Sequence, residues 1–284
     1  MSKILTTLNQ LSDYKKIESD IDGVVLGVKD LSVNYSNTYT VEEIESFLKT
    51  FKKEVFLSVN KNMHKKDLSL LEKVLKTFDG KVNGFFYYDI AVVNFKQKLQ
   101  LKTPLVWAQE HLTTNYSTMN YWYDFGAKYS FVSAEITLEE IKEIKKHAKS
   151  KLIVPIFGRI PMFTSNRFLI TNYHSYFQLD QKKGHFHLEK EGNQIPIEEY
   201  EEGTICYSPH YLNGLKESLL LKEIDYFYFN SYGIDIMTYQ KIINNYKKAT
   251  EENQDALEQE IDFLLEGNTD KGFLYKETVY KVKS

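Results

Sequence analysis

One strand–helix unit sets the pattern for the whole chain: Gly23-Val-Val-Leu-Gly-Val28, followed by Thr40-Val-Glu-Glu-Ile-Glu-Ser-Phe-Leu-Lys-Thr-Phe51. The first segment is apolar throughout, as expected for a strand that is buried on both faces. In the second segment, Thr40 and Glu43 have the spacing of a capping box, and apolar residues recur every three or four positions. A buried strand followed by an amphipathic helix predicts a parallel sheet with right-handed crossovers.

This alternation of apolar strands and amphipathic helices continues almost to the end of the chain. The predicted strands cover residues 3–8, 23–28, 55–59, 82–88, 105–108, 129–133, 152–157 and 224–229. The predicted helices lie around residues 14–17, 40–51, 68–78, 91–99, 114–125, 137–144 and 235–249. Eight such units favour an α/β fold that closes into a β/α (TIM-like) barrel. An open dinucleotide-binding sheet is disfavoured, because no Gly-x-Gly-x-x-Gly follows the first strand.

A segment of different character, residues 162–222, interrupts the pattern after the seventh predicted strand. Its short strand-like runs are separated by glycine-centred turns, which predicts a small antiparallel β insertion. We therefore expect a barrel over residues 1–250, interrupted by this insertion, and a C-terminal extension over residues 251–284 that packs on the barrel. Within the extension, residues 250–266 resemble an acidic helix, and residues 272–282 alternate as in a strand.

Composition limits the classes of function. The 284 residues carry a net charge of −3, with an isoelectric point near 6.2, so the chain lacks the overall positive charge typical of nucleic-acid-binding proteins, and only a local basic patch stays open. The N-terminus lacks the apolar core of a signal peptide, and no apolar run reaches the ~20 residues of a membrane span. The single cysteine, Cys206, excludes an internal disulfide and fits a reducing compartment. These features predict a cytoplasmic protein that binds neither membrane nor DNA.

Polar residues collect at the predicted carboxyl ends of the strands, where β/α barrels carry their active sites. This set comprises Thr6, Thr7, Lys29, Asn60, Lys61, Tyr88, Asp89, Gln109, Glu110, His111, Ser133, Glu135, Gly158, Arg159, Asn230 and Ser231. Arg159 and Arg167 are the two arginines of a chain whose usual cation is lysine. A planar guanidinium suits a carboxylate or phosphate ligand, so we expect an anion near these arginines. The alternative is a buried ion pair with Glu135.

Other candidate sites are weaker. His185 and His187 would face the same side of a strand and could form a metal site with His174 and His210. Since no acidic or cysteine ligand has recognisable spacing with them, surface histidines are the better interpretation, and we predict no metal site. Cys206 has no assignable histidine partner, and a lone cysteine in a strand is usually a core residue.

The region after the sixth strand resembles the signature of peptidase family U32, the collagenase-like proteins. A strand end with Glu135 precedes Leu138-Glu-Glu-Ile141. Further on, Gly158, Ser165 and Arg167 match the pattern Gly-x-x-Cys/Pro-x-x-x-Ser-x-Arg-Cys. The cysteine positions of that pattern hold Pro161 and Phe168 in this chain. The resemblance extends over nearly the whole sequence.

The resemblance implies a function but not a single mechanism. Members of the family include a collagenase-like peptidase of undefined catalytic type and proteins of oxygen-independent or prephenate-dependent hydroxylation, among them hydroxylation of the wobble uridine of transfer RNA. Several of these proteins hold an iron–sulfur cluster on four cysteines. With Pro161 and Phe168 at two of those positions, this chain is expected to bind no cluster or other cofactor. A small anionic, prephenate-like co-substrate is compatible with the resemblance.

The site residues follow from the strand ends together with the family signature. Glu135, Arg167, Arg159 and Asp89 form the predicted catalytic set, in which Glu135 orients Arg167 or handles a proton. The predicted ligand-binding set is Asn60, Lys61, Gln109, Glu110, Ser133, Gly158 and Ser165.

Three functional hypotheses result. The leading one is participation in transfer RNA (wobble uridine) hydroxylation, with this short chain as the cluster-free partner of a longer U32 paralogue. The second is a collagenase-like endopeptidase, although no Ser–His–Asp, Cys–His or zinc-binding spacing supports it. The third is a non-catalytic subunit of a hetero-oligomer. Whether the chain is an enzyme by itself is left open by the sequence.

Overall fold

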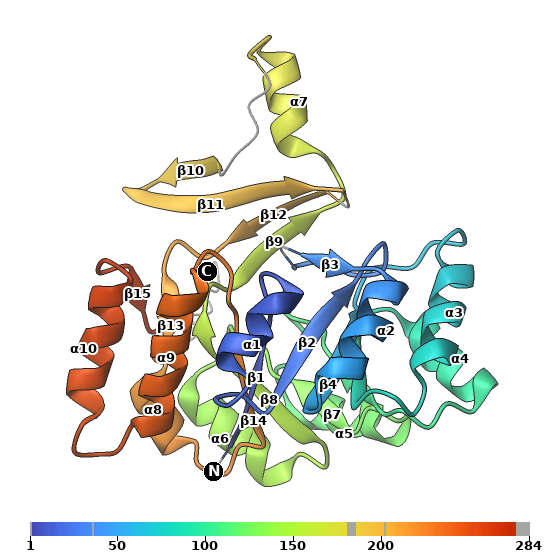
Figure 1. Cartoon of the computed structure of the whole chain (residues 1–284), viewed down its shortest axis with the longest axis horizontal. Coiled ribbons are helices and arrows are strands. Elements are labelled where there is room, and N and C mark those ends of the chain that lie inside the picture. The colour runs from blue at the N-terminus through green and yellow to red at the C-terminus, as the bar shows by residue number, and fades with distance from the viewer. Residues whose placement is uncertain (1, 36, 181–185, 202, 277–284) are drawn as a thin grey trace, which may run out of the picture.

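The computed structural model describes residues 2–276 except 36, 181–185 and 202, and its main body is a closed parallel barrel (Figure 1). The eight barrel strands are β1 (Lys3–Thr6), β2 (Gly23–Val28), β4 (Glu54–Val59), β5 (Gly84–Tyr87), β6 (Leu105–Trp107), β7 (Tyr129–Phe131), β8 (Lys151–Gly158) and β14 (Tyr226–Phe229). Each strand pairs in parallel with its neighbours, and β14 closes the ring by pairing with both β8 and β1. The predicted β/α barrel is confirmed.

Helices surround this barrel as the apolar spacing predicted. They are α1 (Tyr14–Ile17), which follows the short 3-10 helix η1 (Leu11–Asp13), α2 (Val41–Thr50), α3 (Leu68–Phe78), α4 (Ile90–Leu99), α5 (Tyr116–Asp124), α6 (Leu138–His147) and α9 (Ile236–Lys248). Both predicted capping boxes are formed, by Thr40 with Glu43 and by Thr137 with Glu140. Reciprocal side-chain bonds at a helix start satisfy backbone groups that the helix itself leaves unpaired.

Aromatic rings fill the interior of the barrel. The Phe56 ring is fully buried and makes edge contacts with Phe86, Tyr129 and Tyr226, at centroid distances of 5.9, 5.3 and 6.0 Å. Room for this ring comes from Gly84 on the next strand, where a Cβ atom would lie 2.9 Å from the Phe56 ring. Large and small residues on neighbouring strands therefore complement one another inside the barrel.

A second, four-stranded antiparallel sheet follows β8, and we call it the insertion sheet. It consists of β9 (Pro161–Ser165), β10 (Phe186–Lys190), β11 (Asn193–Tyr200) and β12 (Gly203–Tyr207), in the order β10-β11-β12-β9. It lies across the end of the barrel, and α7 (Leu169–Tyr176) projects from it (Figure 1). The insertion predicted after the seventh strand is thus present.

The chain returns to the barrel earlier than residue 222, the predicted end of the insertion. Strand β13 (Tyr211–Asn213) pairs antiparallel with β8, and α8 (Leu215–Leu220) follows it. The β13 segment belongs to the barrel because its backbone continues the main sheet rather than the insertion sheet. The division of the chain into domains stays a prediction.

The C-terminal extension contains α10 (Gln254–Leu264) and β15 (Thr269–Asp270), which pairs with β13. Lys271 connects this extension to α8, because its Nζ donates to the buried carboxylate of Glu217 at 2.8 Å. Of the predicted strand over residues 272–282, residues 272–275 form a turn instead, and residues 277–282 lie outside the described part. Across the described residues, no helix is both long and apolar enough to span a membrane.

Candidate active site

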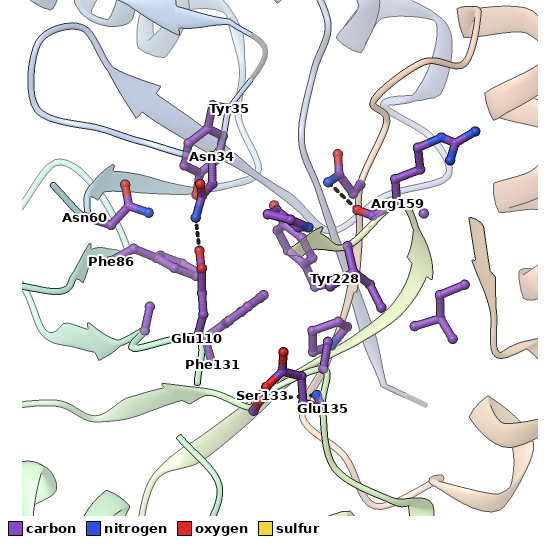
Figure 2. Close-up of a pocket in the computed structure, with 18 of the residues that line it drawn as sticks. Asn34, Tyr35, Asn60, Phe86, Glu110, Phe131, Ser133, Glu135, Arg159 and Tyr228 are labelled. Atoms are coloured by element: carbon purple, nitrogen blue, oxygen red, sulfur yellow. Dashed lines mark hydrogen bonds between the residues drawn. The ribbon is translucent and has the colours of Figure 1, made fainter. Parts of the chain in front are cut away.

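A pocket opens at the carboxyl ends of the barrel strands, between the barrel and strand β9 (Figure 2). Its inner wall is aromatic, formed by Phe86, Phe131 and Tyr228 from three barrel strands or their ends. The Phe131 ring lies 5.7 Å from Phe86 and 4.9 Å from Tyr228, both edge to face. Burial raises the pKa of the Tyr228 hydroxyl, which therefore stays protonated. Such a wall suits a flat or apolar ligand group.

Acidic side chains occupy the polar side of the pocket. Burial raises the pKa of the Glu110 carboxyl above its ordinary value of 4.5, and the Asn34 amide that bonds to it partly opposes that rise. Next to it, His111 Nδ1 lies 3.1 Å from Glu135 Oε2. The Glu135 backbone N–H donates to the Ser133 hydroxyl at 3.2 Å. A carboxyl whose pKa is raised by burial, beside a histidine–carboxylate pair, is a candidate for proton transfer.

Gly158 forms part of the pocket edge for a steric reason. Its φ of +108° is a conformation that side chains disfavour, and a Cβ atom there would lie 2.3 Å from the Asn230 carbonyl oxygen. The glycine therefore lets strand β8 pass close to the end of β14 just before the chain leaves for the insertion. The match of Gly158 to the family signature has this physical basis.

Arg159 lines the pocket, but its guanidinium bonds to backbone carbonyls. Its Nη1 donates to the carbonyl oxygens of Ser208 and Pro209, at 2.6 and 2.5 Å, and its guanidinium stacks on Tyr211 at 4.2 Å. Figure 2 shows the side chain extending away from Glu110 and Glu135. Nη1 of Arg159 is thus engaged by the connection between β12 and β13, and the alternative ion pair with Glu135 is not formed. An anion-binding role for Arg159 stays a prediction.

Arg167 and Ser165 lie on the insertion, away from the pocket. The Ser165 hydroxyl accepts from the Arg167 backbone N–H at 3.1 Å, and the Arg167 carbonyl accepts from Thr204 at 2.8 Å. The Arg167 side chain is exposed and is not among the residues that line the pocket. The predicted orientation of Arg167 by Glu135 is therefore absent from this structure.

Three more predicted site residues bond to backbone near the rim instead of lining the pocket. Asp89 accepts from Ala91 N at 2.8 Å and from Met63 N at 2.9 Å, so it caps α4 and holds the loop after β4. Gln109 donates to the Tyr88 carbonyl at 2.8 Å. Lys61 donates to the Asp30 carbonyl and pairs with Asp67, at 3.1 and 3.4 Å. These side chains fix the loops that shape the site.

Five of the predicted residues do line the pocket with Arg159, and residues from one unpredicted loop join them. The five are Asn60, Glu110, Ser133, Glu135 and Gly158. The loop between β2 and β3 (Thr38–Tyr39) adds Asn34 and Tyr35, and the barrel interior adds the aromatic wall. The sequence carries no motif at Asn34; its left-handed φ of +68°, which asparagine tolerates, is visible only in the structure.

The residues present do not fit an iron–sulfur cluster of the kind that some family members carry. Such clusters need several thiolates, and the chain has one cysteine, Cys206, which lies on β12 with a pKa raised by burial. Pro161 belongs to β9, and Phe168 is exposed beside α7. Within the described residues, no three His, Cys, Asp or Glu side chains are placed to hold a metal ion. His185 lies outside the described part.

The fold and the pocket define a β/α-barrel protein with an aromatic and acidic site at its strand ends, covered by an insertion after the seventh barrel strand. The chain belongs to peptidase family U32, whose family model matches residues 9–283.

Known proteins similar to this chain differ in their names. It is 27% identical to tRNA hydroxylation protein P2 of Bacillus subtilis over 293 residues, which cover 93% of this chain and 94% of that protein. It is 26% identical over 184 residues to the uncharacterized protease MJ0090 of Methanocaldococcus jannaschii, covering 61% of this chain and 44% of the relative. The solved structure of the U32 peptidase Mk0906 matches with a TM-score of 0.55 at 13% identity, covering 82% of this chain and 94% of the other, and shows the shared fold.

Proposed function

We propose that this protein takes part in the hydroxylation of transfer RNA, at the wobble uridine. The observation that carries the proposal is the alignment with the Bacillus subtilis tRNA hydroxylation protein, which spans nearly the full length of both chains. With 93% of this chain and 94% of the relative covered, the alignment is not confined to the barrel.

The pocket offers chemistry that suits this role. Enzymes that modify a base bind it outside the base stack, between aromatic or apolar side chains. Phe86, Phe131 and Tyr228 form such a surface. Replacing a ring C–H by C–OH is a two-electron oxidation, so it requires a co-substrate that supplies the oxygen and is itself reduced. The proton that leaves the carbon needs a base, and we assign that role to Glu110, whose pKa is raised by burial. The His111–Glu135 pair, 3.1 Å apart, is a second proton carrier at the same opening.

A small anionic co-substrate, prephenate-like in character, remains part of the proposal. The Arg167 side chain lies outside the pocket, and Nη1 of Arg159 bonds to the carbonyls of Ser208 and Pro209, so His111 is a further lining side chain that we propose contacts the anion. A role on transfer RNA supports a cytoplasmic location, and a longer U32 paralogue is the proposed partner that would supply any cluster.

Deletion of the gene tests the proposal, with nucleoside mass spectrometry of purified transfer RNA as the measurement. Hydroxyuridine-derived nucleosides should fall in the deletion strain and return on complementation with the wild type or with Thr171→Val, a substitution on α7 outside the pocket. Complementation with Glu110→Gln should fail although the protein accumulates. Unchanged nucleosides in a strain without a second family member would contradict the proposal.

The peptidase hypothesis has one observation in its favour, the names of the archaeal relative and of the solved structure. Incubation of the purified protein with gelatin and peptide libraries separates it from the first proposal. Cleavage that disappears in Glu135→Gln would favour hydrolysis. Co-purification with a cysteine-containing U32 paralogue, without activity of this chain alone, would instead support a non-catalytic subunit.

A further inference from the structure

The loop that presents Asn34 is fastened to the end of strand β4. Asn60 makes two hydrogen bonds with the Val33 backbone, at 3.0 and 3.1 Å. The buried Ser32 hydroxyl donates to the Ser58 carbonyl at 2.5 Å, and the Lys61 N–H donates to the Leu31 carbonyl at 3.1 Å. Because the backbone on the N-terminal side of Asn34 is held at several points, the position of the Asn34 side chain is set by the barrel.

The Asn34 side chain joins two parts of the molecule that are far apart in the sequence. Its Nδ2 donates to Glu110 Oε1 at the end of the barrel strand β6, as the dashed line in Figure 2 shows. Its Oδ1 accepts from the Thr164 hydroxyl on β9 of the insertion sheet. Its backbone N–H points to the Tyr200 hydroxyl on β11, at 3.4 Å. One residue thus contacts the pocket carboxyl and two strands of the insertion sheet.

The chemistry of these groups fixes which way the Asn34 amide faces. An ionised carboxylate can only accept hydrogen bonds, so the amide nitrogen must face Glu110. The amide oxygen then faces Thr164, whose hydroxyl supplies a proton. Removal of the hydroxyl would leave that oxygen without its donor, so the amide would be held by Glu110 alone. The hydroxyl on the insertion sheet therefore helps to hold the hydrogen-bond donor of Glu110 in place.

Other ionisable groups also surround Glu110. His111 on the same turn favours its charged form, whereas Glu135 after β7 opposes it. Tyr228 on β14, Tyr207 on β12 and Tyr35 beside Asn34 interact with it while their own pKa values are raised by burial. Asn34 is the neutral donor in this set, so its effect on Glu110 depends on geometry and not on its own titration.

We propose that Asn34 is a positioning residue through which the insertion sheet controls the orientation and charge of Glu110. When Thr164 is in place, the amide holds the carboxylate toward the pocket and favours its ionised form. When the insertion sheet is drawn away from the rim, the donor is released and the charged form of the carboxyl loses that hydrogen bond. Contact of a substrate with the insertion would in this way reach the acid–base group of the pocket. The inference rests on the proposed role of Glu110 in proton transfer.

The test follows the Glu110 carboxyl directly and needs no substrate. Protein labelled with ¹³C at the glutamate carboxyl carbon is titrated by NMR, and the Glu110 signal is assigned as the one missing from Glu110→Gln. Asn34→Gly removes the amide while keeping a residue that accepts the φ of +68°. The pKa of Glu110 should rise above its wild-type value in Asn34→Gly, because a hydrogen bond to the charged form is lost. In Thr164→Val it should rise by a smaller amount.

Thr171→Val is the matched control, since Thr171 is also an insertion threonine that bonds to a carboxylate, that of Glu199. Its Glu110 titration should coincide with the wild type. A Glu110 signal that titrates identically in the wild type, Asn34→Gly and Thr164→Val, each with native circular dichroism, would overturn the proposal. If transfer RNA nucleosides are unchanged on gene deletion while the titration shifts as expected, the proposed function fails and the positioning role of Asn34 stands.

Discussion

The barrel and the insertion differ in how much of their side-chain surface is buried. Every residue of the barrel strands β2 and β5 is buried, whereas β10 and α7 in the insertion contain no buried residue. The insertion instead exposes large apolar side chains, including Phe163, Tyr176 and Phe177. It is connected to the barrel by particular contacts, such as the Arg159 bonds to the β12–β13 connection and the Tyr207–Tyr232 stack at 3.8 Å. We therefore expect the barrel strands to contribute more to stability than the exposed part of the insertion, β10 and α7.

The largest expected difference in unfolding free energy is between an aromatic substitution in the barrel and one in the insertion. Phe56→Ala should lower the free energy of unfolding by about 4 kcal/mol, because the buried ring leaves a cavity among its aromatic neighbours. Phe163→Ala, at a β9 position that is 46% exposed, should change it by less than about 0.5 kcal/mol. Urea unfolding followed by circular dichroism measures both. Equal losses would show that the insertion sheet is as tightly packed as the barrel.

Two glycines with positive φ sharpen the comparison. Gly158→Ala should cost about 3 kcal/mol, since strain in the backbone adds to the clash with the Asn230 carbonyl. Gly192→Ala, in the turn between β10 and β11, has a φ of +79° and no atom within 4 Å of the added Cβ, so only backbone strain of about 1 kcal/mol is expected. Thermal and urea unfolding should show a larger loss of stability for Gly158→Ala than for Gly192→Ala. The reverse order would contradict the close approach of Gly158 to the Asn230 carbonyl.

The smallest expected effect is a pH dependence from Glu110. Because burial raises its pKa in the folded state, the folded protein binds this proton more tightly than the unfolded chain does. The resulting stability is complete below the ordinary value of 4.5 and is lost as pH rises through the folded pKa. Glu110→Gln has no such proton. As pH rises across that range, the unfolding free energy of Glu110→Gln should therefore increase relative to that of the wild type. Parallel curves for the two proteins would exclude a raised pKa.

The site was only partly predictable, for reasons that differ between residues. Strand ends in a barrel converge on one rim, so Asn60, Glu110, Ser133 and Glu135 could be placed at the pocket from the strand pattern. The direction of a long side chain is not fixed by its position in the sequence. Arg159 therefore lies at the rim as expected, while its guanidinium is taken up by the carbonyls of Ser208 and Pro209.

The sequence by itself determined the barrel, because its signals are local. Each apolar strand, each helical spacing and each capping box, such as Thr40 with Glu43, is encoded within a dozen residues, and eight repeats leave one favourable way to bury them. Only the tertiary structure decided how the insertion meets the rim. The contact of Asn34 with Glu110 and Thr164 joins residues 76 and 130 positions apart, and its geometry depends on a left-handed backbone in a loop. No local pattern encodes such a contact, since it arises from the packing of the two sheets.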